Sequence, residues 1–211
     1  MQSMSAASQK ATLRKMLRRL RAAQNETVRQ AVAEQSAVCA QALLQQVPSY
    51  CILRVGSYCA VGSEASPKAL EAALVQLGAM ICWPRCENKA LRFSPLPPLK
   101  AAAGSSGAAA IPTPPLGSDE LDASELDLIL LPLLGFDALG FRLGQGGGFY
   151  DRALAGCAGR PYRVGVAFEC QRVEQIPVDE WDQRLHAVLT ETGLRFFAIV
   201  TNLDKAPHEA I

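Results

Sequence analysis

The segment GFDALGFRLGQGGGFYDRAL at residues 135–154 holds six glycines and closes on an aromatic pair, an aspartate and an arginine. Glycine adopts positive φ at no steric cost and lets a ligand approach the backbone closely. We expect Gly144, Gly146, Gly147 and Gly148 to use this freedom in a turn between a strand and a helix. The helix would add unpaired N–H groups and the positive end of its dipole, so the turn predicts a phosphate-binding cradle.

Two charged side chains flank these glycines. Arg142 can bind a phosphate through two parallel hydrogen bonds, and Asp151 lies within one helical turn of the glycine amides. Because a carboxylate alone would repel a phosphate, its presence favours a Mg²⁺ ion between them. The segment has no Gly-Lys-Ser/Thr and does not match G-x-G-x-x-G. A flexible turn without a ligand is therefore the alternative interpretation.

The N-terminal region predicts an amphipathic helix over residues 9–22. Leu13, Met16, Leu17 and Leu20 share helical spacing, and a second face carries the basic residues Lys10, Arg14, Arg18 and Arg21. The simplest interpretation is a solvated basic face. Nucleic-acid binding is an alternative, but a net charge of +1 and the lack of interleaved aromatic residues argue against it.

The remaining elements alternate between strands and helices. We expect helices at 26–46, from Ser66-Pro67 to Gly78, from the acidic segment 118–125 and at 149–155, and strands at 50–61, 79–83, 127–134, 163–168, 187–191 and 196–200. This alternation predicts one α/β domain over 1–211, a three-layer α/β/α arrangement whose open, mainly parallel (mixed) sheet has helices on both faces. Ligands of such sheets bind beyond the carboxyl ends of the strands. Residues 97–117, rich in Ala, Gly, Ser and Pro, predict a flexible loop.

Composition excludes several other classes of protein. The seven cysteines are odd in number and form no C-x-x-C pair, which favours buried free thiols in a reducing compartment over disulfides or a zinc site. The longest apolar run is short and broken by Pro132, so we expect no membrane span. The N-terminus lacks the apolar core of a secretory signal. We therefore expect a cytoplasmic protein, with an organelle-targeting N-terminus as the alternative.

The stretch LLPLLGFDALGFRLGQGGGFYDRAL at 130–154 closely resembles the signature of the 5-formyltetrahydrofolate cyclo-ligase family, also called 5,10-methenyltetrahydrofolate synthetases. Shorter segments resemble family elements in the same order along the chain: KATLRK at 10–15, WPR at 83–85, IPTP at 111–114 and QIPVDEWDQRL at 175–185. The resemblance implies ATP- and Mg²⁺-dependent conversion of 5-formyltetrahydrofolate, with or without a polyglutamate tail, to 5,10-methenyltetrahydrofolate, ADP and phosphate. We also expect a monomer without nucleic-acid or membrane partners.

The resemblance further implies roles for individual residues. The implied ATP-binding set is Lys10, Arg14, Arg142, Leu143, Gly144, Gln145, Gly146, Gly147, Gly148, Phe149 and Tyr150. Arg142 and Tyr150 would be catalytic, and Asp151 and Asp182 would bind Mg²⁺. The implied folate-binding set is Cys59, Glu64, Gln145, Gly146, Gly147, Gly148 and Phe149. Arg18 and Arg21 keep the interpretation of solvated side chains.

Three residues depart from the commoner family pattern. Phe149 replaces a tyrosine, Thr113 stands where many members have glutamate, and Trp181 stands where many have histidine. These departures leave a non-catalytic homologue that binds nucleotide or folate as the alternative to an enzyme.

Overall fold

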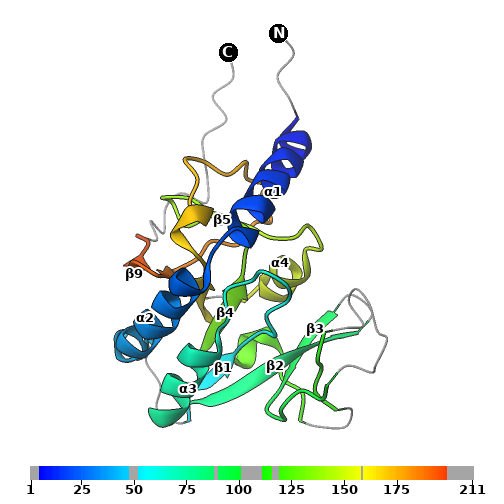
Figure 1. The fold of residues 1–211 in the computed structure, drawn as a ribbon. Helices are drawn as coiled ribbons and strands as arrows, with labels where there is room; N and C mark the ends of the chain where they lie inside the picture. The colour runs from blue at the N-terminus through cyan, green and yellow to red at the C-terminus, as the bar shows by residue number, and fades with distance from the viewer. Residues whose placement is uncertain are drawn as a thin grey trace.

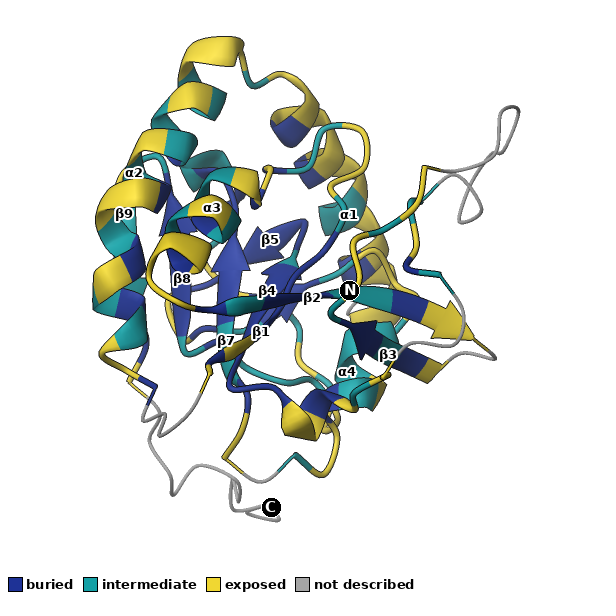
Figure 2. Cartoon of the chain, turned by 90° about the horizontal axis from the view of Figure 1, so that it is seen from below, coloured by how far each residue is buried: buried dark blue, intermediate teal, exposed yellow. Residues whose placement is uncertain are grey.

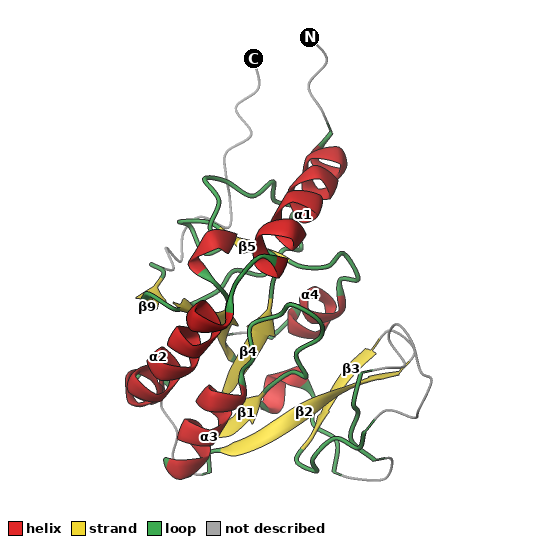
Figure 3. Ribbon diagram, in the orientation of Figure 1, coloured by secondary structure: helices red, strands yellow, loops and turns green. Residues whose placement is uncertain are grey.

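The computed structural model describes residues 5–47, 52–87, 90–100, 111–115, 119–157 and 159–198. Its α-helices are α1 (Ala6–Ala22), α2 (Glu26–Leu44), α3 (Lys68–Gln76) and α4 (Phe149–Leu154). The strands are β1 (Arg54–Gly56), β2 (Met80–Glu87), β3 (Ala90–Ser94), β4 (Leu128–Pro132), β5 (Gly135–Phe136), β6 (Arg142–Leu143), β7 (Tyr162–Val166), β8 (Ala187–Thr190) and β9 (Gly193–Phe196). Figure 3 shows how helices and strands alternate along the chain. None of the helices within these ranges is long and apolar enough to cross a membrane.

The main sheet is mostly parallel, as predicted. Its seven strands lie in the order β3-β2-β1-β4-β7-β8-β9. The five central strands pair in parallel, whereas the edge strands β3 and β9 pair antiparallel to their neighbours. Figure 1 shows β4 and β1 side by side in the middle of the sheet. The mixed α/β architecture expected from the sequence is therefore confirmed.

Helices cover both faces of this sheet. On one face α2 and α3 pack together, and buried side chains such as Leu43 and Leu74 contact the sheet around Val55 and Leu130. On the other face the short helix α4 contributes Leu154 to a second core. Figure 2 shows the central strands buried between the two layers. β4 is buried on both faces, which explains why its sequence LILLP is a continuous apolar run.

The connections of the central strands create a switch point between β1 and β4. The chain leaves β1 through α3 to reach β2 on one side, and it leaves β4 through α4 to reach β7 on the other side. In open α/β sheets, the segments that diverge from such neighbouring strands form a crevice that binds ligands. The two segments here are 57–67, after β1, and 133–148, after β4.

Several predicted boundaries were wrong. β2 continues through Pro84 to Glu87, because beyond Cys82 its pairing within the described residues is with β3 alone, and proline is tolerated at an unpaired strand edge. The strand predicted at 50–61 is only Arg54–Gly56, with 50–51 outside the described residues. The last predicted strand, 196–200, is shifted towards the N-terminus: β9 ends at Phe196, and residues 199–200 lie outside the described ranges.

The loop and helix predictions around residue 110 also need revision. Residue 118 of the acidic segment lies outside the described ranges, and residues 119–125 contain as helix only a 3-10 turn, η2 (Ala123–Glu125), with a capping box between Asp122 and Glu125. Of the loop predicted at 97–117, residues 101–110 and 116–117 lie outside the described ranges. The remaining part contains a backbone bridge in which Leu99 pairs with Thr113. Thr113, one of the departures from the family pattern, therefore lies in an extended segment.

Candidate functional site

The glycine-rich segment is not a simple turn from strand to helix. After β4, the chain first forms the two-stranded β5–β6 hairpin and only then enters α4. Asp137 organises this hairpin: it is 1% exposed and accepts hydrogen bonds from the backbone N–H groups of Leu139 and Phe141 at 2.9 and 3.0 Å. Its second oxygen accepts from Ile176 N at 3.1 Å, which brings the late segment 176–183 to the same place.

Arg142 and Asp151 form an ion pair at the end of this hairpin. Arg142 Nη2 lies 2.8 Å from Asp151 Oδ1, and Arg142 Nη1 donates to the backbone oxygen of Gln183. The Arg142 side chain is only 4% exposed. The structure therefore brings together one predicted phosphate ligand and one predicted metal ligand, and in this state each is the other's counter-ion.

Lys10, on α1, forms ion pairs with two further aspartates. Its Nζ atom lies 2.6 Å from Asp179 Oδ2 and 2.7 Å from Asp182 Oδ2. Burial lowers the pKa of Lys10, but the hydrogen bonds and charges of the two aspartates outweigh this effect and leave the pKa above its ordinary value. Lys10 is therefore a fixed positive charge beside the predicted metal ligand Asp182.

The two predicted metal ligands lie close together through Gln183. Asp151 Oδ1 accepts from Gln183 N at 3.4 Å, and Gln183 directly follows Asp182. Within the described residues, the protein's hydrogen bonds to these carboxylates use Asp151 Oδ1 and Asp182 Oδ2, so one oxygen of each carboxylate is without a protein donor. No cluster of three or more His, Cys, Asp or Glu side chains that could hold a metal occurs in the same residues. Two carboxylates fit Mg²⁺, which commonly completes its shell with phosphate oxygens and water.

α1 lies along the glycine-rich segment, but its buried face differs from the prediction. Lys10, Leu17 and Arg21 are buried on one stripe, whereas Met16 and Leu20 are 45% and 41% exposed. Basic and apolar residues thus share the face of α1 that packs against the rest of the protein. The prediction was wrong because it sorted side chains by polarity, and this face packs against backbone carbonyls and carboxylates as well as against apolar groups.

The arginines of α1 hold the glycine-rich segment directly. Arg14 Nε donates to Gly144 O at 3.0 Å. Arg18, predicted to be solvated, is exposed, but its Nε and Nη2 atoms lie 3.1 and 2.9 Å from Gln145 Oε1. Leu143, in the predicted ATP-binding set, buries its side chain with Leu17 in a small core, so that side chain is structural.

The glycines differ from one another in conformation. Gly146 and Gly148 have φ values of +104° and +63°, as expected of residues that need to be glycine, whereas Gly144 and Gly147 do not use positive φ. Gly147 is constrained by space instead, because a Cβ atom there would lie 2.8 Å from the ring of Phe149. The cradle expected from four positive-φ glycines is therefore built from two.

The aromatic pair occupies two environments. Arg152 stacks its guanidinium over the Phe149 ring, with 5.2 Å from Cζ to the ring centroid. Tyr150 faces the interior, and burial raises the pKa of its hydroxyl, with Cys86 and Glu64 adding to the effect and Arg142 opposing it. Tyr150 therefore remains a neutral hydrogen-bond donor near residues from both segments of the switch point.

The predicted folate residues Cys59 and Glu64 lie in the segment after β1. Burial raises the pKa of the Cys59 thiol, with a further contribution from Glu71, so Cys59 is a neutral thiol. Glu64 Oε2 accepts from Val61 N at 3.0 Å, and its Oε1 atom lies 3.6 Å from Arg21 Nη1. Arg21, predicted to be solvated, is 5% exposed and belongs to this part of the site.

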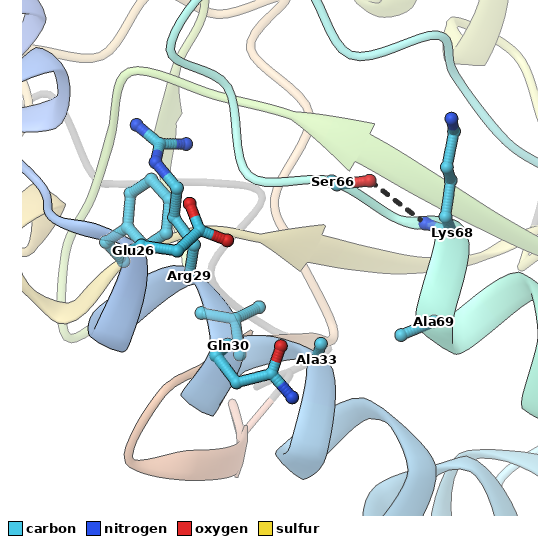
Figure 4. Close-up of a pocket in the computed structure, with 9 residues that line it drawn as sticks. Glu26, Arg29, Gln30, Ala33, Ser66, Lys68 and Ala69 are labelled. Atoms are coloured by element: carbon cyan, nitrogen blue, oxygen red, sulfur yellow. Dashed lines mark hydrogen bonds between the residues drawn. The ribbon is translucent and has the colours of Figure 1, made fainter.

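A separate hollow of about 290 Å³ lies between the N-terminal ends of α2 and α3. Figure 4 shows Glu26 and Arg29 of α2 on one side and Lys68 of α3 on the other, with the hydrogen bond from Lys68 N to Ser66 Oγ. None of the residues that line it belongs to the predicted site set. The arrangement that could do chemistry is therefore the charged cluster at the β1/β4 switch point. This cluster consists of the ion-paired side chains of Lys10, Arg21, Glu64, Arg142, Asp151, Asp179 and Asp182.

Three residues in or beside this cluster were not predicted from the sequence. Asp179 binds Lys10, Gln183 contacts both Arg142 and Asp151, and Arg21 contacts Glu64. Asp179 lies within the family-like segment QIPVDEWDQRL, so its spacing of three from Asp182 was an available signal. Gln183 contacts Arg142 and Asp151 through its backbone. Such contacts do not depend on the type of side chain, so the sequence gives no signal for them. Trp181, the departure beside Asp182, is 59% exposed.

The expectation of buried free thiols is confirmed in part. All six cysteines in the described ranges are free, as predicted, but only Cys82 is buried, and Cys86 is exposed. Cys51 lies outside the described residues.

Comparison with known proteins identifies the family. The model of the 5-formyltetrahydrofolate cyclo-ligase family matches residues 6–191. The chain is 35% identical to the 5-formyltetrahydrofolate cyclo-ligase of Mycolicibacterium smegmatis over 143 residues, which cover 64% of this chain and 72% of that protein. It is 51% identical to the enzyme of that name from Escherichia coli K12 over 73 residues, which cover 34% of this chain and only 40% of the relative.

The fold agrees with solved structures from the same group. A 5,10-methenyltetrahydrofolate synthetase from Aquifex aeolicus superposes with a TM-score of 0.71 at 24% identity, over 95% of this chain and 99% of that one. A second, from Mycoplasma pneumoniae, gives a TM-score of 0.62 at 20% identity, over 86% and 98% of the two chains. From the family match and the Mycolicibacterium relative, the chain belongs to the 5-formyltetrahydrofolate cyclo-ligase family.

Proposed function

We propose that this protein converts 5-formyltetrahydrofolate to 5,10-methenyltetrahydrofolate, with ATP and Mg²⁺ as co-substrate and cofactor and with ADP and phosphate as the other products. The observation that carries the proposal is the charged cluster at the β1/β4 switch point. It joins Lys10 and Arg142 to Asp182 and Asp151 beside the positive-φ glycines. Such a site supplies cations for phosphates and carboxylates for a metal, which suits phosphoryl transfer.

The reaction needs ATP because a formyl amide is a weak electrophile whose oxygen leaves poorly. In the proposed mechanism, the formyl oxygen attacks the γ-phosphorus, and the bond from that phosphorus to ADP breaks. N10 of the folate then attacks the formyl carbon. This attack closes the five-membered ring. N10 then loses its proton, the carbon–oxygen bond breaks, and phosphate departs with the former formyl oxygen.

The protein's part is positioning and charge neutralisation. Lys10, Arg14 and Arg142 would bind the phosphates, and the segment 144–148 would surround them. Mg²⁺ held by Asp151 and Asp182 would neutralise the charge that develops on the phosphate oxygens. Tyr150, a neutral hydroxyl beside Glu64 and Arg142, would donate a hydrogen bond to the reacting groups.

The test is an absorbance assay for the methenyl product. Purified protein with Mg-ATP and 5-formyltetrahydrofolate should produce the methenyl chromophore, and omission of ATP should abolish the signal. Binding of both ligands by calorimetry without turnover would instead identify a non-catalytic binding protein, the alternative raised by Phe149, Thr113 and Trp181. Folded protein that neither binds nor converts the substrates would refute the proposal.

The metal assignment has its own test in Asp151→Asn. Asparagine keeps an oxygen for Arg142 and Gln183 but removes the charge that Mg²⁺ needs. We expect turnover to fall at least about tenfold and the Mg²⁺ concentration for half-maximal rate to rise. Calorimetry should show a parallel loss of Mg-ATP affinity. The exposed Asp119→Asn serves as the matched control. Unchanged Mg²⁺ dependence in a folded Asp151→Asn protein would refute the assignment.

A further inference from the structure

Arg21 is a buried cation at the junction of α1 with both segments of the switch point. Its Nε atom donates to Ser63 Oγ at 3.1 Å, and its Nη1 atom donates to Leu133 O at 3.2 Å. The same Nη1 atom lies 3.6 Å from Glu64 Oε1. Arg21 therefore connects α1 to the end of β4 and to two consecutive residues of the segment after β1.

Burial of this guanidinium carries a cost that its partners offset. Burial lowers the pKa of Arg21, and the negative charge of Glu64 raises it. A buried charge persists in proteins when it is paired and hydrogen-bonded, as Arg21 is. A role in stability alone would be met by any packed side chain at this position. Arginine instead offers several N–H donors in fixed directions, which indicates that the orientation of the groups bound to Arg21 is important here.

The consequence of these contacts is a fixed Glu64 carboxylate. Its side chain is 11% exposed, with Oε2 bound to Val61 N and Oε1 facing Arg21. The next residue, Ala65, is also fixed, because its carbonyl oxygen accepts from the buried hydroxyl of Tyr58. On the other side of Arg21, Leu133 O accepts a second hydrogen bond from Gln171 Nε2 at 2.8 Å. The guanidinium thus lies between two anchored segments of backbone.

We propose that Arg21 is a positioning residue for folate binding, which acts by holding Glu64 in the orientation that receives the pterin ring. This inference rests on the proposed function and on the folate-binding role that the family resemblance implies for Glu64, whose carboxylate would accept hydrogen bonds from the N–H groups of the pterin. Arg21 itself does not touch the substrate. Its loss should therefore weaken folate binding and leave nucleotide binding intact, because the ATP-binding residues Lys10 and Arg142 have separate partners.

The experiment measures the dissociation constants of 5-formyltetrahydrofolate and of Mg-ATP separately by calorimetry, for Arg21→Gln and Arg21→Lys. We expect Arg21→Gln to weaken folate binding by about tenfold or more, the usual effect of losing a hydrogen bond to a charged group, and to change ATP affinity less than twofold. Arg21→Lys should retain part of the folate affinity, because it keeps the charge but not the forked donors. The exposed Arg19→Gln on the same helix is the matched control.

A double-variant cycle with Glu64→Gln separates positioning from a general structural effect. If Arg21 acts through Glu64, the protein with both Arg21→Gln and Glu64→Gln should bind folate no more weakly than Glu64→Gln alone. Losses that multiply, or equal losses of folate and ATP affinity, would overturn the inference. If Arg21→Gln does not fold, Arg21→Lys and Ser63→Ala carry the same comparison. Wild-type protein that fails to bind folate would refute the proposed function, whereas wild-type binding that Arg21→Gln leaves unchanged would refute only this inference.

Discussion

The charges of the candidate site neutralise one another in pairs. Two of the three cations proposed to bind phosphates contact a carboxylate proposed to bind the metal: Lys10 contacts Asp182, and Arg142 contacts Asp151. The third, Arg14, donates to Gly144 O instead. Removing one member of a buried pair leaves the other charge without compensation, which is more costly than replacing both. A ligand that carries both signs, such as ATP with Mg²⁺, can satisfy all four side chains at once. At the scale of residues, this pairing of charges therefore supports the proposed binding of ATP together with Mg²⁺.

His186 makes a prediction about pH at the same scale. It stacks on Tyr162 and accepts from Arg163 N at 2.8 Å through Nδ1. Burial, with a smaller effect of Arg163, lowers the pKa of His186 from 6.5 to about 4. Between these values the unfolded chain binds the proton and the folded protein does not. The free energy of unfolding should therefore decrease as the pH falls from 6.5 to 4, by about 3 kcal/mol for this group.

Urea denaturation of wild type and His186→Asn at pH 7 and pH 4.5 measures this contribution. Asparagine retains an acceptor for Arg163 N but does not titrate, whereas the carboxylates titrate in both proteins and cancel in the comparison. We expect wild type to lose about 2–3 kcal/mol more than His186→Asn between the two pH values. Equal losses would show that His186 is charged in the folded protein.

At the scale of elements, the segment between β6 and α4 should depend on backbone conformation more than on side chains. Gly146 has a φ of +104°, so Gly146→Ala would strain the backbone by about 1–3 kcal/mol and shift the amides that are proposed to surround the phosphates. We expect Mg-ATP affinity to fall by about tenfold, which corresponds to 1.4 kcal/mol of that strain. Calorimetry of Mg-ATP binding is the measurement.

Gly156 provides the matched control for this prediction. It also has a positive φ, +82°, and lies just beyond α4, where an added Cβ atom would meet no other atom within 4 Å. Gly156→Ala should lower the melting temperature through the same backbone strain but leave Mg-ATP affinity unchanged. If both variants bind Mg-ATP as wild type does, the segment 144–148 does not contact the nucleotide.

Some of these elements could be predicted from the sequence, and others could not. β4 and β8 could be predicted because strands buried on both faces read as apolar runs, LILLP and AVLT. The β5–β6 hairpin was missed because its strands have two residues each and depend on the Asp137 carboxylate for their closure. Arg142 and Asp151 could be named from their residue types near the glycines. Lys10 and Asp182 are 172 residues apart, so only the folded chain shows that they pair.

At the scale of the whole molecule, α1 differs from the other long helix in what holds it. α2 buries Val32, Ala40 and Leu43 in the main core beneath the sheet. α1 has Leu17 as its single fully buried apolar side chain, with Leu13 partly buried in the same small core. Most of its other contacts are polar bonds from Lys10, Arg14, Arg18 and Arg21 to the site. Figure 1 shows α1 beside β5, away from the layer formed by α2 and α3. The stability of α1 should therefore depend on the site and on its ligand.

This difference predicts a specific pattern of amide hydrogen exchange. Without ligand, the amides of α1 should exchange faster than those of α2, because local opening of α1 exposes little apolar surface and breaks mainly polar contacts. A non-hydrolysable ATP analogue with Mg²⁺ should slow exchange in α1, since Lys10 and Arg14 would then hold phosphates as well as protein groups, and should leave α2 unchanged. Lys10→Met should remove most of this ligand-induced protection. Equal slowing of both helices would indicate a general stabilisation instead, and no slowing in α1 would place the nucleotide away from this helix.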